Sequence, residues 1–220
     1  MKIGITGWRG FIGSHLSTHI STNPVLFQGD IRDSGAVKEF VGQCDRIYHL
    51  AGKNRAEDGQ ILANNLVGTG NLVLATKLLG TNPEIVFASS KQVEWNPNSE
   101  YGLAKMIEEN IVRKASKWCV FRIPNVYGEG CKPFYNSVVA TFCWQLANRE
   151  PCTTHQPFAT REFVYIDDLV SVLVEPILHR VIGVSGEVMS IREVHEYLTT
   201  RLGEHEKLKK CLDWYKEEDK

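Results

Sequence analysis

Tyr101 and Lys105 form a pair whose spacing suits proton transfer to a carbonyl or alcohol oxygen. If the stretch around them is helical, a separation of four residues puts the phenol and the ammonium on one face, about one turn apart. A free tyrosine has a pKa of about 10, and a neighbouring lysine cation lowers it by favouring the phenolate. A hydroxyl from Ser89 or Ser90 can orient the reacting oxygen. The alternative interpretation is a half-buried tyrosine beside a solvated lysine.

The elements that must position this pair are expected to be alternating strands and helices. Strand-like apolar segments occur at 3–6, 25–28, 45–52, 84–88 and 118–123, and helical patterns occur to about 20 and over 34–41, 61–79, 101–115 and 138–148. This alternation predicts an α/β fold with a Rossmann-like, doubly wound parallel sheet and right-handed crossovers. We expect a single domain over 1–220, with about 1–125 forming mainly the dinucleotide-binding sheet and about 126–220 a small C-terminal substrate cap.

A glycine-rich stretch, GWRGFIG over 7–13, follows the first strand. The spacing of Gly7, Gly10 and Gly13 is related to the fingerprint in which the backbone turns tightly and approaches a pyrophosphate at a helix N-terminus. Its position between a strand and a helix favours a dinucleotide site over an ordinary turn. Arg9, inside the loop, is a candidate to bind the 2′-phosphate of NADP, with a plain surface arginine as an equal alternative.

The end of the second strand carries mixed evidence on the cofactor. Asp30 falls where an acidic residue holds the adenine ribose of NAD, whereas Arg32 favours NADP, as Arg9 does. Asp30 is alternatively a turn residue or the cap of the helix over 34–41. The evidence here leaves both cofactors open.

Two other segments carry weaker signals. The strand over 45–52 ends in small residues, up to Gly52, which allow a cofactor ring to lie against the backbone. His49 in this strand is interpreted as a packed core histidine. The charged tail from Glu204 predicts a solvated helix or a frayed end.

Bulk composition is that of an ordinary globular chain. The 220 residues are 43% hydrophobic and 23% charged, with a net charge of −1. This near-zero charge gives no reason to expect binding to nucleic acid or to an anionic membrane, and no apolar run reaches membrane-spanning length. The six cysteines have no C-x-x-C or zinc-like spacing, which predicts reduced thiols in a cytoplasmic protein without a structural metal.

Four motifs occur in an order typical of one enzyme family. They are the glycine loop, HLAG at 49–52, the set of Ser90, Tyr101 and Lys105, and FRIPNVYG at 121–128. Together they resemble the extended branch of the short-chain dehydrogenase/reductase superfamily, the NAD-dependent epimerase/dehydratase family, which acts on nucleotide sugars. The resemblance covers roughly residues 2–200.

Three stretches are similar to the reductase half of a bifunctional capsule-biosynthesis enzyme of this family. They are HLAGKNR (49–55), SSKQ (89–92) and CKPFYNSVVATFC (131–143). The similarity implies NADPH-dependent reduction of a UDP-linked 2-acetamido-2,6-dideoxy-hexos-4-ulose, a precursor in polysaccharide synthesis. NADP(H) is therefore favoured as cofactor, with NAD(H) possible, and a UDP-linked sugar is favoured as substrate. The metal-binding half of that enzyme has no counterpart in this sequence, so no epimerisation by it is expected.

The family pattern implies a role for each matching position. Tyr101 would donate a proton to the carbonyl oxygen, and Lys105 would lower the pKa of Tyr101 and hold the nicotinamide ribose. Ser90 would polarise the carbonyl, with Ser89 as the alternative. The implied cofactor contacts are Gly7, Gly10, Phe11, Ile12, Gly13, Asp30, Ile31, Leu50, Ala51 and Asn65, and the implied sugar-nucleotide contacts are Asn125, Asn136 and, at the diphosphate, Arg161.

Departures from the family pattern bear on the fold and the reaction. Only about 25 residues separate the first helix from HLAG, so one sheet strand is expected to be missing. Ser90 is followed by Lys91 and Gln92, where dehydratases carry an acid pair, and elimination therefore has no evident machinery. The alternatives to a reductase are a nucleotide-sugar epimerase or dehydratase, and a non-catalytic dinucleotide-binding regulator or partner subunit.

The family also implies a homodimer. Its members pair through the helices that correspond to 65–79 and 101–115, in an isologous contact. Leu72, Val73, Ile107 and Ile111 are candidates for that contact, although they could equally face the sheet.

Overall fold

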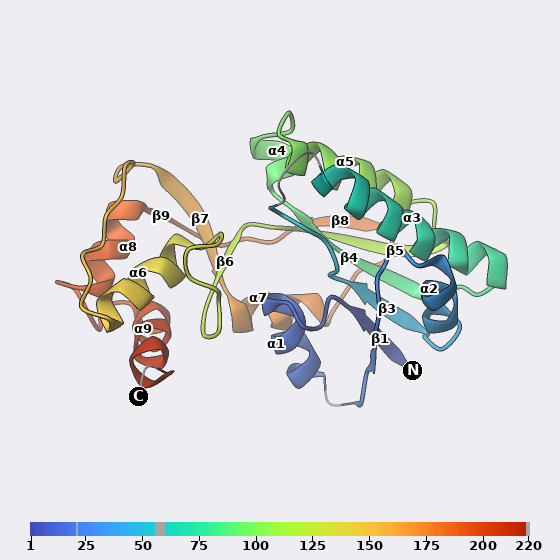
Figure 1. Cartoon of the computed structure of the whole chain (residues 1–220), viewed down its shortest axis with the longest axis horizontal. Coiled ribbons are helices and arrows are strands. Elements are labelled where there is room, and N and C mark those ends of the chain that lie inside the picture. Colours follow the sequence, from blue (N-terminus) through green and yellow to red (C-terminus); the bar gives the residue numbers. More distant parts are fainter. Residues whose placement is uncertain (21, 56–59, 219–220) are drawn as a thin grey trace. The chain divides into compact units, whose positions relative to one another are not determined.

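The computed structural model describes residues 1–20, 22–55 and 60–218 (Figure 1). The contacts of the chain divide it into two compact units. Unit 1 comprises Met1–Ile123 with Val170–Val184, and unit 2 comprises Pro124–Leu169 with Ser185–Lys220. Within the described ranges, no helix combines the length and the apolar character needed to cross a membrane.

Unit 1 is built on a six-stranded parallel sheet in the order β2-β1-β3-β4-β5-β8. The strands are β1 (Ile3–Thr6), β2 (Val25–Leu26), β3 (Arg46–His49), β4 (Glu84–Ser90), β5 (Lys117–Ile123) and β8 (Arg180–Gly183). The predicted Rossmann-like parallel sheet is thus confirmed. The Rossmann order 3-2-1-4-5-6 has a further strand at the β2 edge. The described residues supply none there, in line with the short spacing in the sequence.

Helices cover both faces of this sheet (Figure 1). α2 (Ser34–Val41), α3 (Gln60–Leu79) and α5 (Glu100–Val112) share one face, and α1 (Phe11–His19) lies on the other. The connection from β1 to β2 leads toward one edge of the sheet, whereas the connections from β2 to β3, from β3 to β4 and from β4 to β5 lead toward the other edge. Because each crossover is right-handed, α1 has to lie on the opposite face from α2, α3 and α5. The core beneath α2, α3 and α5 includes Val37, Phe40, Leu72, Val73, Ile85, Phe87 and Val120.

Unit 2 contains a three-stranded sheet in the order β6-β7-β9. Its strands are β6 (Asn125–Tyr127), β7 (Thr160–Tyr165) and β9 (Glu187–Ser190), with β6 parallel and β9 antiparallel to β7. The helices α6 (Val138–Ala147), α8 (Ile191–Leu198) and α9 (Glu206–Glu218) of this unit pack together. α7 (Ile166–Leu173) follows β7 directly and is divided between the units, because this part of unit 2 ends at Leu169 and unit 1 resumes at Val170. The short strands β6, β8 and β9 and the helix α8 were not predicted.

Helix α9 corrects the prediction for the charged tail. The segment is a helix, but it is not merely solvated, because one of its faces is buried. The buried residues are Leu208, Cys211, Leu212 and Tyr215. Their spacing of three and four residues is that of an amphipathic helix, a pattern that the dense charges between them concealed.

The N-terminus of α2 is fixed by Asp33, and not by Asp30. Asp33 Oδ1 accepts hydrogen bonds from the backbone N–H groups of Gly35 and Ala36, at 2.9 and 3.2 Å. These two groups would otherwise have no partner inside the helix. Asp33 is therefore the N-cap of α2, and the alternative in which Asp30 caps this helix is wrong.

Replacing Asp33 by alanine should lower the free energy of unfolding by about 1 kcal/mol, because the two helical N–H groups lose their acceptor. Asp33→Asn is the matched control, since asparagine caps helices about as well. Urea titrations of both variants, followed by circular dichroism, measure the difference. Equal stability of Asp33→Ala and Asp33→Asn would show that the cap contributes nothing.

Candidate active site

Local packing fixes the start of the helix that carries Tyr101 and Lys105. Ser99 is the N-cap of α5, and its Oγ accepts a hydrogen bond from Gly102 N at 3.0 Å. A Cβ on Gly102 would lie 2.3 Å from the carbonyl oxygen of Asn96. The helix therefore starts in direct contact with the turn after α4 (Gln92–Trp95).

Lys105 is buried beside Tyr101. Its Nζ donates to the carbonyl oxygen of Ala88 at 3.2 Å, forms an ion pair with Glu108 Oε2 at 3.2 Å, and lies 5.9 Å from the centre of the Tyr101 ring. Burial acts to lower the pKa of this ammonium, whereas Glu108 and then Tyr101 act to raise it, and the net pKa is raised. The side chain is thus a cation held next to the phenol, as the four-residue spacing predicted.

The two serines at the end of β4 point to opposite faces of the sheet, because successive strand residues alternate. Ser89 is buried, and its hydroxyl donates to Glu109 Oε1 at 2.7 Å. Ser90 is half-buried at the carboxyl end of the strand, and its Oγ accepts from Gln92 N at 3.2 Å. The Ser90 oxygen acts as acceptor in that bond, so its hydrogen can be donated to a ligand. This geometry favours Ser90 over Ser89 for contact with a substrate.

The glycine loop between β1 and α1 has the backbone geometry that a pyrophosphate site requires. Gly7 has a φ of +70°, and a Cβ on Gly13 would lie 2.2 Å from the Gly7 carbonyl oxygen. Gly10 is the N-cap of α1, and the structure shows no side-chain hydrogen bond at this cap and no acidic side chain in the first turn. The first backbone N–H groups of α1, at Phe11 and Ile12, are therefore placed to bind an anion.

A cavity of about 190 Å³ lies at the carboxyl ends of β2 and β3. It brings together several of the residues that were predicted to contact the cofactor. It is lined by Asp30, Ile31, Arg32, Ala51, Gly52, Lys53, Asn64 and Asn65. Asn65 clamps the loop after β3, since its Oδ1 accepts from Lys53 N at 2.8 Å and its Nδ2 donates to the Lys53 carbonyl at 3.0 Å. The residues of unit 1 thus fit a dinucleotide.

The charged groups near this cavity are engaged with one another. Arg32 Nε donates to Asp30 Oδ1 at 2.9 Å, and this bonding lowers the pKa of Asp30 to about 2. Arg32 also donates to Asn64 Oδ1 at 3.0 Å. Arg9 lies 4.7 Å from the Trp8 ring and donates to Gln28 Oε1 at 3.0 Å. Asp30 is therefore the partner of Arg32, whereas Arg9 has a neutral partner.

A second cavity, of about 410 Å³, lies within unit 2. It brings together Asn125, Asn136 and Arg161, the three positions that the family resemblance implied for the sugar nucleotide. Asn125 Nδ2 donates to the carbonyl oxygen of Glu162 at 3.0 Å, which fixes its orientation. The other lining residues are Ser137, Val138, Thr154, His155, Gln156, Ala159, Phe163 and Ile191.

The loop residues Thr154, His155 and Gln156 of this cavity were missed in the sequence. They lie between α6 and β7, where neither helical nor strand periodicity occurs. The available signal was the run of polar residues itself, because ligand contacts are concentrated on loops that a scaffold holds in place.

Comparisons with known proteins agree with this geometry. A family model described as the NAD dependent epimerase/dehydratase family matches residues 3–191. The chain is 33% identical over 182 residues to UDP-2-acetamido-2,6-beta-L-arabino-hexul-4-ose reductase of Pseudomonas aeruginosa, covering 77% of this chain and 48% of that protein. The chain thus spans about half the length of this relative.

Solved structures show the same fold. UDP-glucose 4-epimerase of Thermotoga maritima, solved with UDP-glucose, matches with a TM-score of 0.85 at 19% identity, over 100% of each chain. The capsular polysaccharide assembling protein CapF of Staphylococcus aureus matches with a TM-score of 0.78 at 24% identity, over 98% of this chain and 66% of that chain. The fold and the family resemblance inferred from the motifs are confirmed.

Single alanine substitutions should separate the two serines. Ser90→Ala should lower kcat on a carbonyl substrate by ~10²–10³-fold, the usual cost of losing a donor to a developing oxyanion, with stability unchanged. Ser89→Ala should instead lower the free energy of unfolding by about 1–3 kcal/mol, because it breaks a buried bond to a carboxylate. Steady-state turnover and thermal denaturation of both variants measure this. The opposite pattern would assign the substrate contact to Ser89.

Proposed function

The chain belongs to the NAD dependent epimerase/dehydratase family, and on that basis we propose that it uses NAD(P)H to reduce the C4 ketone of a nucleotide-linked 4-keto-6-deoxy hexose. The observation that carries the proposal is the buried Lys105 ammonium beside Tyr101, at the strand end that presents Ser90. The name of the 33% identical Pseudomonas aeruginosa reductase supports a UDP-linked 2-acetamido sugar as the substrate.

The residues of the site supply the proton and hold the reacting oxygen. A nicotinamide cofactor, when bound, would supply a hydride for the C4 carbon. Tyr101 donates its phenolic proton to the carbonyl oxygen, which becomes a hydroxyl, and the Lys105 cation stabilises the phenolate left behind. Ser90 donates a hydrogen bond to the same oxygen as negative charge develops on it. Solvent then returns a proton to Tyr101, so hydride and proton together account for the alcohol formed.

The residues after Ser90 support reduction over dehydration. Elimination of water across C5 and C6 needs one carboxylic acid and one carboxylate, and Lys91 and Gln92 supply neither. The nearest carboxylate along the chain, Glu94, accepts a hydrogen bond from Arg122 Nη1 at 2.8 Å. Glu94 is therefore engaged with β5, in keeping with a reaction that uses a single proton donor.

NADP(H) is the proposed cofactor in preference to NAD(H). Asp30, the candidate for a ribose hydroxyl of NAD, is bonded to Arg32 through both carboxylate oxygens. Arg9 has an exposed bond to a neutral amide, which a 2′-phosphate can replace with a stronger charge-assisted one. The charge balance at the cavity thus supports the phosphorylated cofactor.

The cavity of unit 2 is the proposed site for the nucleotide part of the substrate. Arg161 is exposed, and its guanidinium uses Nη1 in a bond to the Thr160 carbonyl at 2.9 Å. Its remaining donors can bind a diphosphate, which arginine recognises well. The amides of Asn125 and Asn136 add neutral donors and acceptors, which suits a base or a sugar hydroxyl.

We also propose a homodimer formed through the outer faces of α3 and α5. Leu72 and Val73 are buried in the core of unit 1 and cannot supply this contact, and Ile111 packs against that core. The exposed apolar residues of the two helices form the outer surface. They are Val67, Leu74, Leu78 and Leu103. Val67, Leu74 and Leu78 recur at helical spacing on one side of α3.

The reaction is tested by supplying preformed 4-keto-6-deoxy UDP-, dTDP- and GDP-sugars with NADPH and identifying products by mass spectrometry. We expect NADPH oxidation and a product two hydrogens heavier, most rapidly with a UDP sugar. UDP-N-acetylglucosamine with NAD should give no 4-keto product. Tyr101→Phe should retain cofactor binding and lose ~10²–10⁴-fold in turnover. Dehydration in the second assay, with no reduction in the first, would reject the reductase.

Replacing Leu74 by glutamate should convert the dimer to a monomer. In an isologous interface each subunit contributes the same residue, so the substitution would bury two unpaired carboxylates. Val172→Glu is the matched control, since Val172 is an exposed apolar residue of α7 outside this surface. Analytical ultracentrifugation distinguishes the two states. A monomeric parent chain at working concentration would refute the dimer, whatever the variants do.

A further inference from the structure

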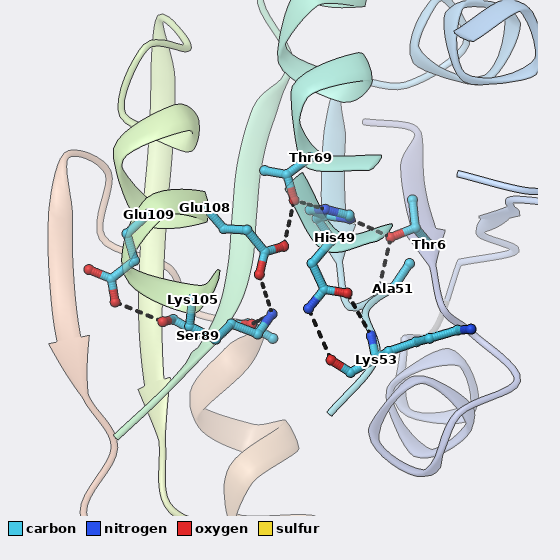
Figure 2. Close-up of polar contacts among 11 residues, drawn as sticks. Thr6, His49, Ala51, Lys53, Thr69, Ser89, Lys105, Glu108 and Glu109 are labelled. Atoms are coloured by element: carbon cyan, nitrogen blue, oxygen red, sulfur yellow. Dashed lines mark hydrogen bonds and ion pairs between the residues drawn. The ribbon is translucent and has the colours of Figure 1, made fainter. Parts of the chain in front are cut away.

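A chain of buried hydrogen bonds connects the Lys105 ammonium to the backbone at the dinucleotide cavity (Figure 2). It begins with the ion pair between Lys105 Nζ and Glu108 Oε2, at 3.2 Å. It continues from Thr69 Oγ1 to Glu108 Oε1 at 2.6 Å and between His49 Nε2 and Thr69 Oγ1 at 2.9 Å.

The chain ends at the loop after β3. Thr6 Oγ1 lies 2.8 Å from His49 Nδ1 and accepts from Ala51 N at 3.2 Å. Ala51 and the adjoining Gly52 line the cavity of unit 1. The side chains of this buried relay come from four elements, namely Thr6 from β1, His49 from β3, Thr69 from α3, and Lys105 and Glu108 from α5.

None of the five residues that form the relay, from Lys105 to Thr6, is more than 5% exposed. An unpaired charge buried this deeply destabilises the fold, so the ion pair stabilises both groups, and removal of either partner would destabilise the other. Glu108 acts to raise the pKa of Lys105 against the burial that lowers it. Removing this one carboxylate would leave the ammonium without its nearest counter-charge.

The positions of the protons along the relay follow from its chemistry. A carboxylate only accepts, so Thr69 donates its hydroxyl hydrogen to Glu108, and the Thr69 oxygen accepts from His49 Nε2–H. Burial and the Lys105 cation lower the pKa of His49 to about 3, so the ring is neutral and Nδ1 carries no proton. Thr6 then donates to His49 Nδ1 and accepts from Ala51 N–H. Each bond fixes the direction of the next.

The other ionisable groups around Lys105 are already accounted for. Tyr101 is the proton donor of the proposed reaction, and His49 on β3 is neutral. Glu109 acts in the same direction as Glu108 on the pKa of Lys105, but its carboxylate accepts from Arg122 Nη2 at 2.8 Å and from Arg113 Nη2 at 3.1 Å. The α3 residue of the relay, Thr69, carries no charge. Glu108 is thus the carboxylate in ion-pair contact with Lys105.

We propose that Glu108 is a positioning residue that keeps Lys105 charged beside Tyr101 and, through Thr69, His49 and Thr6, holds the Ala51 N–H at the rim of the dinucleotide cavity. This role rests on the proposed reduction, because it acts through Lys105. It couples the proton-transfer pair on α5 to the loop after β3, where Ala51 and Gly52 line the cavity. Neither Glu108 nor His49 needs to touch the substrate for this purpose.

Glu108→Gln tests the charge, because glutamine keeps the shape of glutamate. The Lys105 ammonium should lose its proton at lower pH than in the parent, since burial is no longer opposed by the carboxylate. The basic limb of the pH profile of kcat/KM should therefore move to lower pH. NMR titration of ¹³Cε-labelled lysine, with Lys105 assigned through Lys105→Met, measures the same shift without any turnover.

Thr69→Val tests the relay, because valine has the shape of threonine and lacks the hydroxyl. We expect about a tenfold loss of kcat and a change in the ¹⁵N signals of the His49 ring, whose Nε2–H loses its acceptor. Thr69→Ser should restore both. Thr76→Val is the control, since Thr76 is another buried threonine of α3 whose hydroxyl binds the Val73 carbonyl. It should leave the pH profile and the His49 signals unchanged.

An unchanged Lys105 titration in Glu108→Gln would overturn the proposal, as would an unchanged His49 ring in Thr69→Val. If Glu108→Gln does not fold, the His49 ring signals of Thr69→Val and Thr69→Ser decide whether the relay exists. If the parent chain reduces none of the keto sugars, the proposed function fails, and the two NMR measurements still decide whether the relay holds Lys105 charged.

Discussion

A positive charge held in the dry interior of unit 1 is the constraint on which the site depends. Lys105 is 5% exposed, and its Nζ lies 4.5 Å from the centre of the Phe87 ring. Desolvation alone favours the neutral amine, which could not stabilise a phenolate at Tyr101 as the proposed reaction requires. The cation is kept by the Glu108 carboxylate, the Ala88 carbonyl and the aromatic face together. The elements around it therefore have to meet at one point with little freedom.

The close packing of these elements around Lys105 explains why glycines occur at Gly52 and Gly68. A Cβ on Gly52 would lie 3.5 Å from both Lys105 Nζ and the Asn65 amide, so the loop after β3 passes close to the ammonium. Gly68 is equally constrained, because a Cβ there would meet Ile31 Cγ2 at 2.5 Å. These contacts bring α3 and the loop after β2 together at the same edge. The cavity of unit 1 and the proposed proton-transfer pair are therefore parts of one packed structure within this unit.

Much of unit 1 could be predicted because its signals are local. The span of α2 matched its apolar periodicity, and Tyr101 and Lys105 lie on one face of α5 as their spacing required. What escaped prediction depends on partners far along the chain. The interpretation of His49 as a buried histidine was right about its burial, but nothing near it in sequence indicates Thr69 or Thr6 as its neighbours. The buried face of α9 was hidden in the same way, since only its packing distinguishes it from a charged tail.

The adjacent acids Glu108 and Glu109 show how one helix separates two electrostatic tasks. Successive residues of a helix point about 100° apart, so neighbours in sequence face different partners. Glu109 turns to Arg122 on β5 and to Ser89 on β4, and ties α5 to the sheet. Glu108 turns to Lys105 and Thr69, and tunes the charge at the site. A shift of α5 along the sheet would keep Lys105 and Glu108 together, because both lie on this helix, but it would separate Glu108 from Thr69 and Lys105 from the Ala88 carbonyl. The register of α5 on the sheet, fixed by the bonds of Glu109, therefore places the Lys105–Glu108 pair against Thr69 of α3 and the carboxyl end of β4.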